Sequence, residues 1–110
     1  MTGTRLERLK HLREENPGDI FTLFALAKEF EKAGATEDAS RCYQELLISD
    51  PDYLGAYFHF GKLLELLGVD NQALDIYRQG IERSKAANDI HSLAELQNAY
   101  QNLLLELDEV

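Results

Sequence analysis

Apolar residues recur at spacings of three and four along most of this chain, which is the period of one helical face. Two pairs of such stretches occupy the middle: Ile20–Phe30 with Ala39–Leu47, and Leu54–Leu64 with Ala73–Ile81. Flanking stretches of the same kind run over Arg5–Glu15 and Asp89–Leu107. The pattern predicts an all-α chain of about six helices.

Residues suited to helix ends fall between these stretches. Gly34 and Gly68 follow the first stretch of each pair, and we expect them to end those helices because glycine adopts the left-handed conformation at little cost. Thr36 and Asp70 are the expected N-caps of the helices that follow. Pro51 is expected in the first turn of the next helix, where proline is tolerated.

The sequence also repeats itself with a shift of 34 residues. The shift superposes identical residues, namely Pro17 on Pro51, Phe24 on Phe58, Lys28 on Lys62, Gly34 on Gly68, Ala39 on Ala73 and Tyr43 on Tyr77. A fixed period of this length is typical of an array built from one repeated supersecondary unit. Each unit here corresponds to one pair of helical stretches.

At these positions the chain resembles the tetratricopeptide repeat family. The matching residues are Leu23, Leu26-Ala27, Phe30, Ala39, Tyr43, Leu46 and Pro51 in the first unit, and Tyr57, Phe60-Gly61, Leu64, Ala73, Tyr77 and Gly80 in the second. Lys85 stands where the second unit would carry its closing proline. The resemblance covers Ile20 to Lys85 and implies a right-handed α-solenoid of antiparallel helix pairs.

The repeat frame divides the chain, taken as one domain over residues 1–110. Residues 1–17 form an N-terminal capping helix, 18–50 the first repeat, 51–85 the second repeat, and 86–110 a last helix. This last helix has two interpretations. It is either the first helix of a third repeat, with two residues inserted near Asn88, or a plain C-terminal cap. We prefer the first helix of a third repeat, extended into a cap.

Composition narrows the classes of function. The net charge is -9, from 20 acidic and 11 basic residues, which argues against nucleic acid and anionic membranes because both require a basic surface. Solubility or a salt-adapted source explains the acidity without any function. No apolar run is long enough for a membrane span, and no signal-peptide core is visible, so we expect a cytoplasmic protein.

The sequence offers little for catalysis or metal binding. The three histidines are far apart, and neither a His-Glu-x-x-His nor a paired-cysteine pattern occurs, so we expect no metal. No glycine-rich phosphate loop is present, and we expect no cofactor and no enzymatic activity. The single cysteine, Cys42, lies on an apolar stripe and is expected to be a small buried residue.

The family resemblance implies a concave groove lined by the first helix of each pair. The side chains expected to face it are Phe21, Phe24, Ala25, Lys28 and Lys32 in the first unit, Phe58, His59, Lys62 and Leu66 in the second, and His91, Glu95 and Asn98 in the last helix. All of them lie off the core stripes. Some members of the family hold a chaperone tail with a lysine and asparagine clamp, but Ala25 and His59 do not reproduce that clamp.

A phenylalanine and a lysine four residues apart recur in both units, as Phe24 with Lys28 and Phe58 with Lys62. That spacing places an aromatic ring and a cation on one helical face, which would suit a peptide with apolar and acidic groups. The alternative is that the two phenylalanines pack against each other between units. In that alternative, glutamates of the same helices (Glu29, Glu31 and Glu65) hold the lysines.

The end of the chain carries more leucine than one packed face requires, notably at Leu104 and Leu105. These residues either broaden the buried stripe of a cap or stay exposed and drive self-association. The sequence therefore predicts a protein-interaction scaffold that binds a peptide or helix in its groove. The alternative is a structural or assembly module that self-associates through the last helix. The oligomeric state is expected to be a monomer or a weak homodimer.

Overall fold

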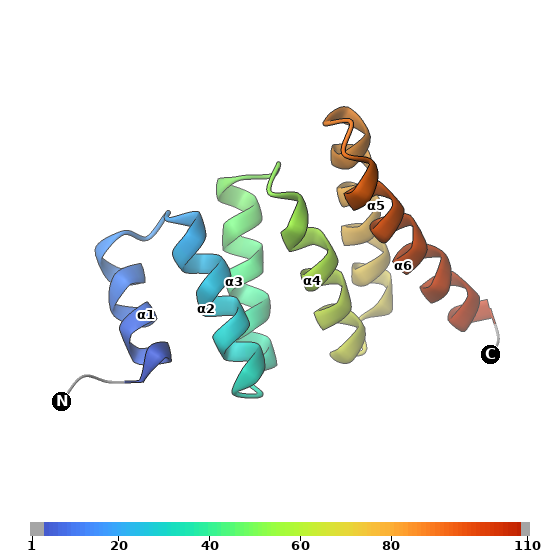
Figure 1. Cartoon of the computed structure of the whole chain (residues 1–110). Helices are drawn as coiled ribbons and strands as arrows, with labels where there is room; N and C mark the ends of the chain where they lie inside the picture. Colours follow the sequence, from blue (N-terminus) through green and yellow to red (C-terminus); the bar gives the residue numbers. More distant parts are fainter. Residues whose placement is uncertain (1–3, 109–110) are drawn as a thin grey trace. The chain divides into compact units, whose positions relative to one another are not determined.

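A computed structural model describes residues 4–108, and the described residues form six α-helices without strands. The helices are α1 (Arg5–Glu15), α2 (Ile20–Lys32), α3 (Thr36–Ser49), α4 (Leu54–Leu66), α5 (Asp70–Ala86) and α6 (Ile90–Asp108) (Figure 1). The predicted all-α class and the helix positions are confirmed. The chain divides into two compact units, Met1–Pro51 and Asp52–Val110, and the division falls at the expected start of the second repeat.

The first unit is built around the antiparallel pair of α2 and α3 (Figure 1). The side chains of Leu23, Leu26 and Ala27 on α2, together with Tyr43 and Leu46 on α3, are almost fully buried. Helix α1 packs on α2 and buries only Leu9 of its three predicted leucines. Residues three apart on a helix drift around its axis, which is why Leu12 is 48% exposed.

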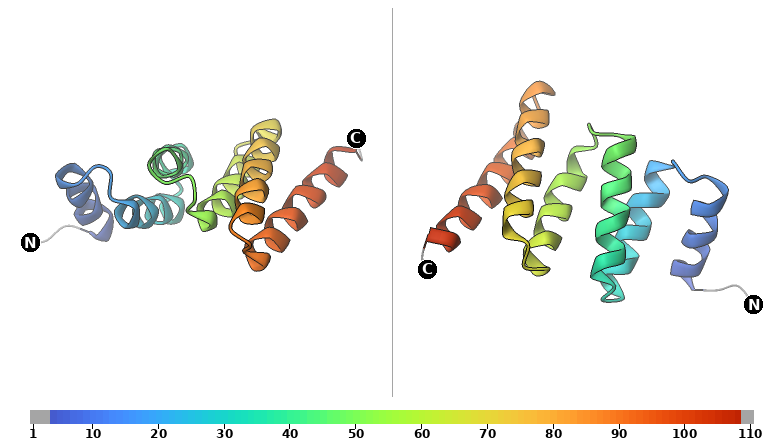
Figure 2. Two further views of the ribbon diagram at one scale, coloured as in Figure 1. Left: turned by 90° about the horizontal axis from the view of Figure 1, so that it is seen from above. Right: turned by 180° about the vertical axis from the view of Figure 1, so that it is seen from behind.

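In the second unit, α5 packs against both α4 and α6 (Figure 2). Two buried glycines allow these close contacts. A Cβ atom on Gly61 would overlap the ring of Tyr77, and one on Gly80 would lie 2.7 Å from the Cβ of Tyr57 and 2.9 Å from a methyl of Leu96. Helices approach closely only where such side chains are missing. The small residues of the repeat pattern therefore set the helix spacing in this unit.

Three turns in the chain share one helix-ending motif. Gly34 and Gly68 have φ 77° and Asn88 has φ 57°, all in the left-handed region. In each turn this residue and the next donate backbone N–H groups to two carbonyls of the last helical turn, as with Gly34 to Glu31 and Ala35 to Phe30. This is the Schellman arrangement. The connection between α5 and α6 is thus of the kind found within a repeat, without the Asp-Pro turn that joins α3 to α4.

The turn geometry corrects three sequence predictions. Thr36 and Asp70 are not N-caps, because the N-cap positions belong to Ala35 and Val69, whose side chains make no capping bond. The Schellman turn ends at these residues, and the next helix starts at once. Pro51 lies in a turn before α4, which begins at Leu54, so it is not in the first helical turn.

Side-chain caps occur instead at the starts of α1, α2 and α6. The Thr4 hydroxyl accepts a bond from the Glu7 N–H and the Glu7 carboxylate accepts one from the Thr4 N–H, which forms a capping box on α1. Asp19 accepts a bond from Thr22 at the start of α2, and Asp89 accepts one from Ser92 at the start of α6. The Ser92 bond lowers the pKa of Asp89.

We predict that Gly61→Ala lowers the free energy of unfolding by about 1–3 kcal/mol, because the added methyl overlaps the Tyr77 ring and forces repacking. Gly55→Ala is the matched control, since Gly55 is an exposed helical glycine where an added Cβ would lie in ordinary contact, 3.9 Å from the Tyr53 ring. That control should stabilise the chain by about 0.5–1 kcal/mol. Denaturant titration measures both, and equal stabilisation by the two substitutions would contradict the packing described.

We further predict that Asn88→Ala lowers the free energy of unfolding by about 1 kcal/mol, because alanine is strained at positive φ. Asn88→Gly should cost nothing, since glycine adopts this conformation freely. Thermal unfolding of the two variants tests the turn. If Asn88→Ala melts at the same temperature as Asn88→Gly, the left-handed geometry of the α5–α6 turn is wrong.

Candidate functional site

A tyrosine, a glutamate and a lysine form the same arrangement in each unit. In the first unit, the Tyr43 hydroxyl on α3 donates a hydrogen bond to the Glu31 carboxylate on α2. The ammonium of Lys28, one turn earlier on α2, lies 3.8 Å from the same carboxylate. The glutamate thus links the two helices of the pair and holds a cation beside them.

The second unit repeats this geometry. The Tyr77 hydroxyl on α5 donates to Glu65 on α4, and the Lys62 ammonium lies 3.9 Å from Glu65. The Lys62 ammonium also lies 6.0 Å from the centre of the Phe58 ring, within the range of a cation–π contact. The sequence contained the signal for this, since tyrosine, glutamate and lysine all recur at the 34-residue shift. Our prediction considered the glutamates only as partners of the lysines and missed the tyrosine hydroxyls.

Both tyrosine hydroxyls lie in a poor environment for a phenolate. Burial, followed by the hydrogen bond to the adjacent glutamate, raises the pKa of Tyr43 and of Tyr77 far above the usual range. Both hydroxyls therefore remain protonated donors at neutral pH. The tyrosine–glutamate bonds are stable structural supports for the two lysines.

Phe24 and Phe58, the two phenylalanines of the expected site that recur at the 34-residue shift, are each half-buried. Phe24 packs edge-on against Tyr43, with 6.2 Å between ring centroids, so it also contributes to its own helix pair. The expectation that Phe24 is not needed by the core is therefore wrong, because the Tyr43 ring that fills the interface extends to it. Phe58 contacts His59 edge-on at 5.8 Å.

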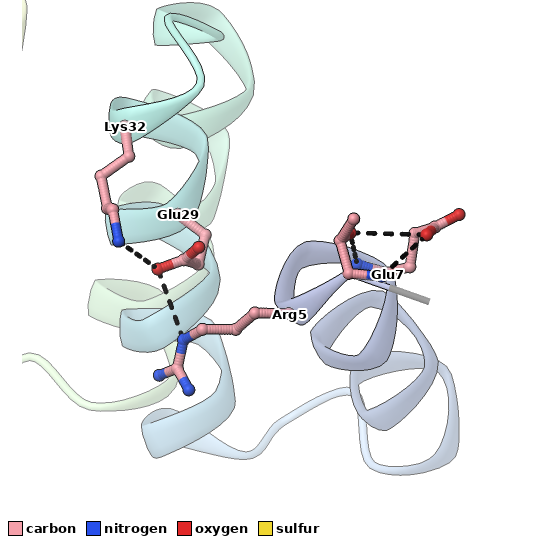
Figure 3. A network of polar contacts seen from close by, with 5 residues as sticks. Arg5, Glu7, Glu29 and Lys32 are labelled. Atoms are coloured by element: carbon pink, nitrogen blue, oxygen red, sulfur yellow. Dashed lines mark hydrogen bonds and ion pairs between the residues drawn. The ribbon is translucent and has the colours of Figure 1, made fainter. Parts of the chain in front are cut away.

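Lys32 takes part in a different charge cluster at the end of α2. Its ammonium lies 3.4 Å from Glu29, and the Arg5 guanidinium on α1 lies 3.3 Å from the same carboxylate (Figure 3). The glutamate pairings named in the alternative interpretation, with Lys28, Lys32 and Lys62, are thus all present. The network in Figure 3 also ties α1 to α2 within the first unit.

The remaining expected site residues lie at the surface of their units. Phe21 and Leu66 are each 78% exposed, and Ala25 and His59 are half-exposed. On α6, which contacts α4 within the second unit, Glu95 and Asn98 are exposed, and so is His91. The first helix of each repeat, α2 or α4, therefore presents a strip of these residues at the surface of its unit. The strip on α2 consists of Phe21, Phe24, Ala25, Lys28 and Lys32, and the strip on α4 of Phe58, His59, Lys62 and Leu66.

Residues 4–108 give little support for a reactive cysteine, a metal site or a membrane-spanning helix. Cys42 is buried, and burial raises the pKa of its thiol to about 11, so the reactive thiolate is scarce at neutral pH. Within this part of the chain no group of three or more His, Cys, Asp or Glu side chains is placed to hold a metal ion. None of the described helices has the length and apolar character needed to cross a bilayer.

Comparison with solved structures decides the family. The crystal structure of a tetratricopeptide repeat domain protein from Salinibacter ruber is 41% identical over 77% of this chain and 94% of that chain, with a TM-score of 0.72. The chain belongs to the tetratricopeptide repeat family. Its fold class, an α-solenoid of antiparallel helix pairs, is confirmed by this likeness.

Two solved structures of lower sequence identity share the fold. A protein from Bordetella parapertussis is 23% identical, covers 96% of this chain and 91% of that chain, and superposes with a TM-score of 0.80. The TPR2B domain of yeast Sti1 is 15% identical over 92% of this chain and 81% of that domain, with a TM-score of 0.82. No protein-family model matches the sequence, and no curated protein does.

We predict that stability falls as the pH rises above about 10, the ordinary pKa of tyrosine. Tyr43 and Tyr77 have raised pKa values when folded, so the folded state keeps protons that the unfolded state releases. Their contribution is fully present below about pH 10 and is lost as the pH rises. Denaturant titrations at about pH 8 and pH 11 measure this, with the Tyr43→Phe/Tyr77→Phe double variant expected to lose less stability over the interval. An equal loss in both proteins would show that other groups control the alkaline transition.

Proposed function

We propose that this tetratricopeptide repeat protein is a protein-interaction module that binds a peptide along the exposed strips of its first helices. One observation carries the proposal: an aromatic ring and a lysine recur four residues apart in both units, each beside the same tyrosine–glutamate support. Core packing alone requires the tyrosine but does not require a lysine at this place in both units.

The geometry of the lysines supports ligand binding. Each ammonium lies 3.8–3.9 Å from its glutamate, whereas a charge-assisted N–H···O bond is roughly 2.7–2.9 Å long. The glutamate attracts the lysine to one place on the strip, and the tyrosine hydroxyl already uses part of the carboxylate. An incoming carboxylate would therefore meet an ammonium that is positioned in advance, which reduces the cost of ordering it.

The neighbouring side chains suit the apolar part of such a peptide. Phe21 and Leu66 are large apolar residues with most of their surface in water, at opposite ends of the strips on α2 and α4. Exposed apolar residues beside a cation form a surface for a peptide with acidic and apolar side chains. In the second unit, Glu95 and Asn98 on α6 add a carboxylate and an amide that can bind peptide backbone groups.

A relative of the same fold supports the class of partner. The TPR2B domain of yeast Sti1 was solved as a complex with pHsp70. At 15% identity this supports a protein or peptide partner in general. Ala25 and His59 stand where the known clamp would need other residues, so the proposal does not extend to chaperone tails.

The same observations favour binding over catalysis and over other macromolecules. The buried Cys42, with its raised pKa, is a poor nucleophile. The net charge of -9 opposes binding to nucleic acid and to anionic lipid. A free, buried cysteine also suits a reducing compartment, and we propose a cytoplasmic location.

We predict that Lys28→Glu/Lys62→Glu weakens binding of an acidic–apolar peptide at least about tenfold, because two attractive charges become repulsive. The probe is a fluorescent peptide that alternates glutamate with leucine and phenylalanine, measured by anisotropy against a peptide with lysine in place of glutamate. The matched control is Arg41→Glu/Arg78→Glu, which makes the same change in net charge on the second helices α3 and α5. Equal weakening by both double variants would mean that only net charge matters, and the strips would not be the site.

A further inference from the structure

The last helix exposes a face that the equivalent helices bury. In the repeat frame, Leu93, Gln97 and Tyr100 on α6 take the places of Tyr57, Gly61 and Leu64 on α4. The three α4 residues are buried, and Gly61 lies against Tyr77 of the second helix of its repeat. On α6, Leu93 and Tyr100 are half-exposed and Gln97 is exposed. Among the described residues no helix follows α6 to cover this face.

This face carries a regular seam. Residues spaced alternately by three and four form it, namely Ile90, Leu93, Gln97, Tyr100, Leu104 and Leu107. The spacing is that of the core positions of a coiled coil. A second set on α6, Leu96, Ala99 and Leu103, is buried inside the unit. Helix α6 therefore has one seam that is buried in its own unit and a second that is half-buried at Leu93, Tyr100, Leu104 and Leu107 and exposed at Gln97 and Ile90, with Ile90 80% exposed.

Gln97 decides what kind of helix can cover the seam. Within the repeats, this place holds Ala27 or Gly61, which allows the partner helix to approach closely. A glutamine side chain prevents that approach, so a further helix of the repeat type would not fit. The wider spacing between the helices of a coiled coil accommodates glutamine as one polar core position.

We propose that the seam pairs with the α6 seam of a second copy of this chain in an antiparallel, two-fold arrangement. The seam is self-complementary in that orientation. Ile90 meets Leu107 of the second copy, and Leu93 meets Leu104 of the second copy. Gln97 meets Tyr100 of the second copy, so the one polar layer at the centre pairs an amide with a hydroxyl, twice by symmetry.

Charge placement supports a second copy as the occupant. Helix α6 contains no lysine or arginine, and two of its three acidic residues, Glu95 and Glu106, lie on the opposite side from the seam, so they do not repel across it. Antiparallel pairing keeps the Asp108 carboxylates of the two copies at opposite ends of the pair. Parallel pairing would place the two acidic ends together.

A hollow of about 420 Å³ lies next to Leu107, the last seam position. Its other lining residues are Gly68 and Val69 of the α4–α5 turn and the polar residues Asp70, Asn71 and Gln72 at the start of α5. The exposed Ile90 of the second copy would be placed at this hollow. Leu105, which we had paired with Leu104 as a candidate for self-association, lies off the seam and is 60% exposed.

Sedimentation equilibrium over micromolar to millimolar concentrations tests the pairing. The chain should show a monomer–dimer equilibrium, and Gln97→Lys should raise the dissociation constant at least about tenfold by bringing like charges together at the centre. Gln97 is exposed, so the monomer should keep its fold, which circular dichroism checks. The matched control Leu105→Lys should leave the constant unchanged within about twofold, since surface changes outside an interface have little effect. A chain that stays monomeric throughout, or equal effects of the two variants, would overturn the proposal.

Cysteine cross-linking tests the orientation. Under mild oxidation the Ile90→Cys/Leu107→Cys variant should form a disulfide-linked dimer, whereas Ile90→Cys alone should not, because residue 90 meets residue 107 of the second copy. The native Cys42 is buried and should not react. Efficient cross-linking by Ile90→Cys alone would show a parallel pair and would overturn the antiparallel arrangement.

The dimer seam and the peptide-binding strips occupy different surfaces. An experiment can therefore reject one of the two proposals and leave the other standing. Glu95 and Asn98 lie off the seam, and Lys28 and Lys62 lie on other helices. Gln97→Lys should therefore leave binding of the acidic–apolar peptide unchanged. Lys28→Glu/Lys62→Glu should leave the dimer constant unchanged.

Discussion

The close approach of two helices within each repeat is the constraint on which the other features of the structure depend. In the second unit this approach exists because Gly61 has no side chain where the Tyr77 ring lies. The ring then fills the interface, and its hydroxyl reaches the Glu65 carboxylate on the facing helix. Glu65 in turn attracts Lys62. A missing methyl group thus determines the position of a surface cation.

This chain of contacts explains why core and site cannot be assigned to separate residues here. Tyr43 and Tyr77 are among the most buried side chains of the described chain, yet their hydroxyls support the exposed strips. Phe24 belongs to both the core and the strip, because it contacts the buried Tyr43 ring and also lies on the strip of α2. Changes to the interior of a repeat are therefore expected to alter the strip as well. The proposed binding surface is rigid because the packing beneath it is rigid.

The first and the last described helix join their neighbouring repeats in different ways. Helix α1 is short and is tied to the first repeat by Leu9 and by the ion pair between Arg5 and Glu29. Helix α6 is long, follows a Schellman turn instead of an Asp-Pro turn, and covers α5 with one of its two apolar seams. The second seam of α6 is half-buried at four of its six positions and exposed at Ile90 and Gln97.

The sequence by itself determined the helices and the 34-residue repeat, because apolar spacing and glycine positions are local properties of the chain. It also determined that the core contains Leu23, Leu26, Tyr43 and Tyr77. It could not give the N-caps at Ala35 and Val69, because these follow from how tightly each Schellman turn closes. Nor could it show that Glu31 and Glu65 each contact a tyrosine and a lysine. It also could not show that Leu104 is half-buried whereas Leu105 is exposed. Such contacts depend on the distance and rotation between packed helices, which only the tertiary structure sets.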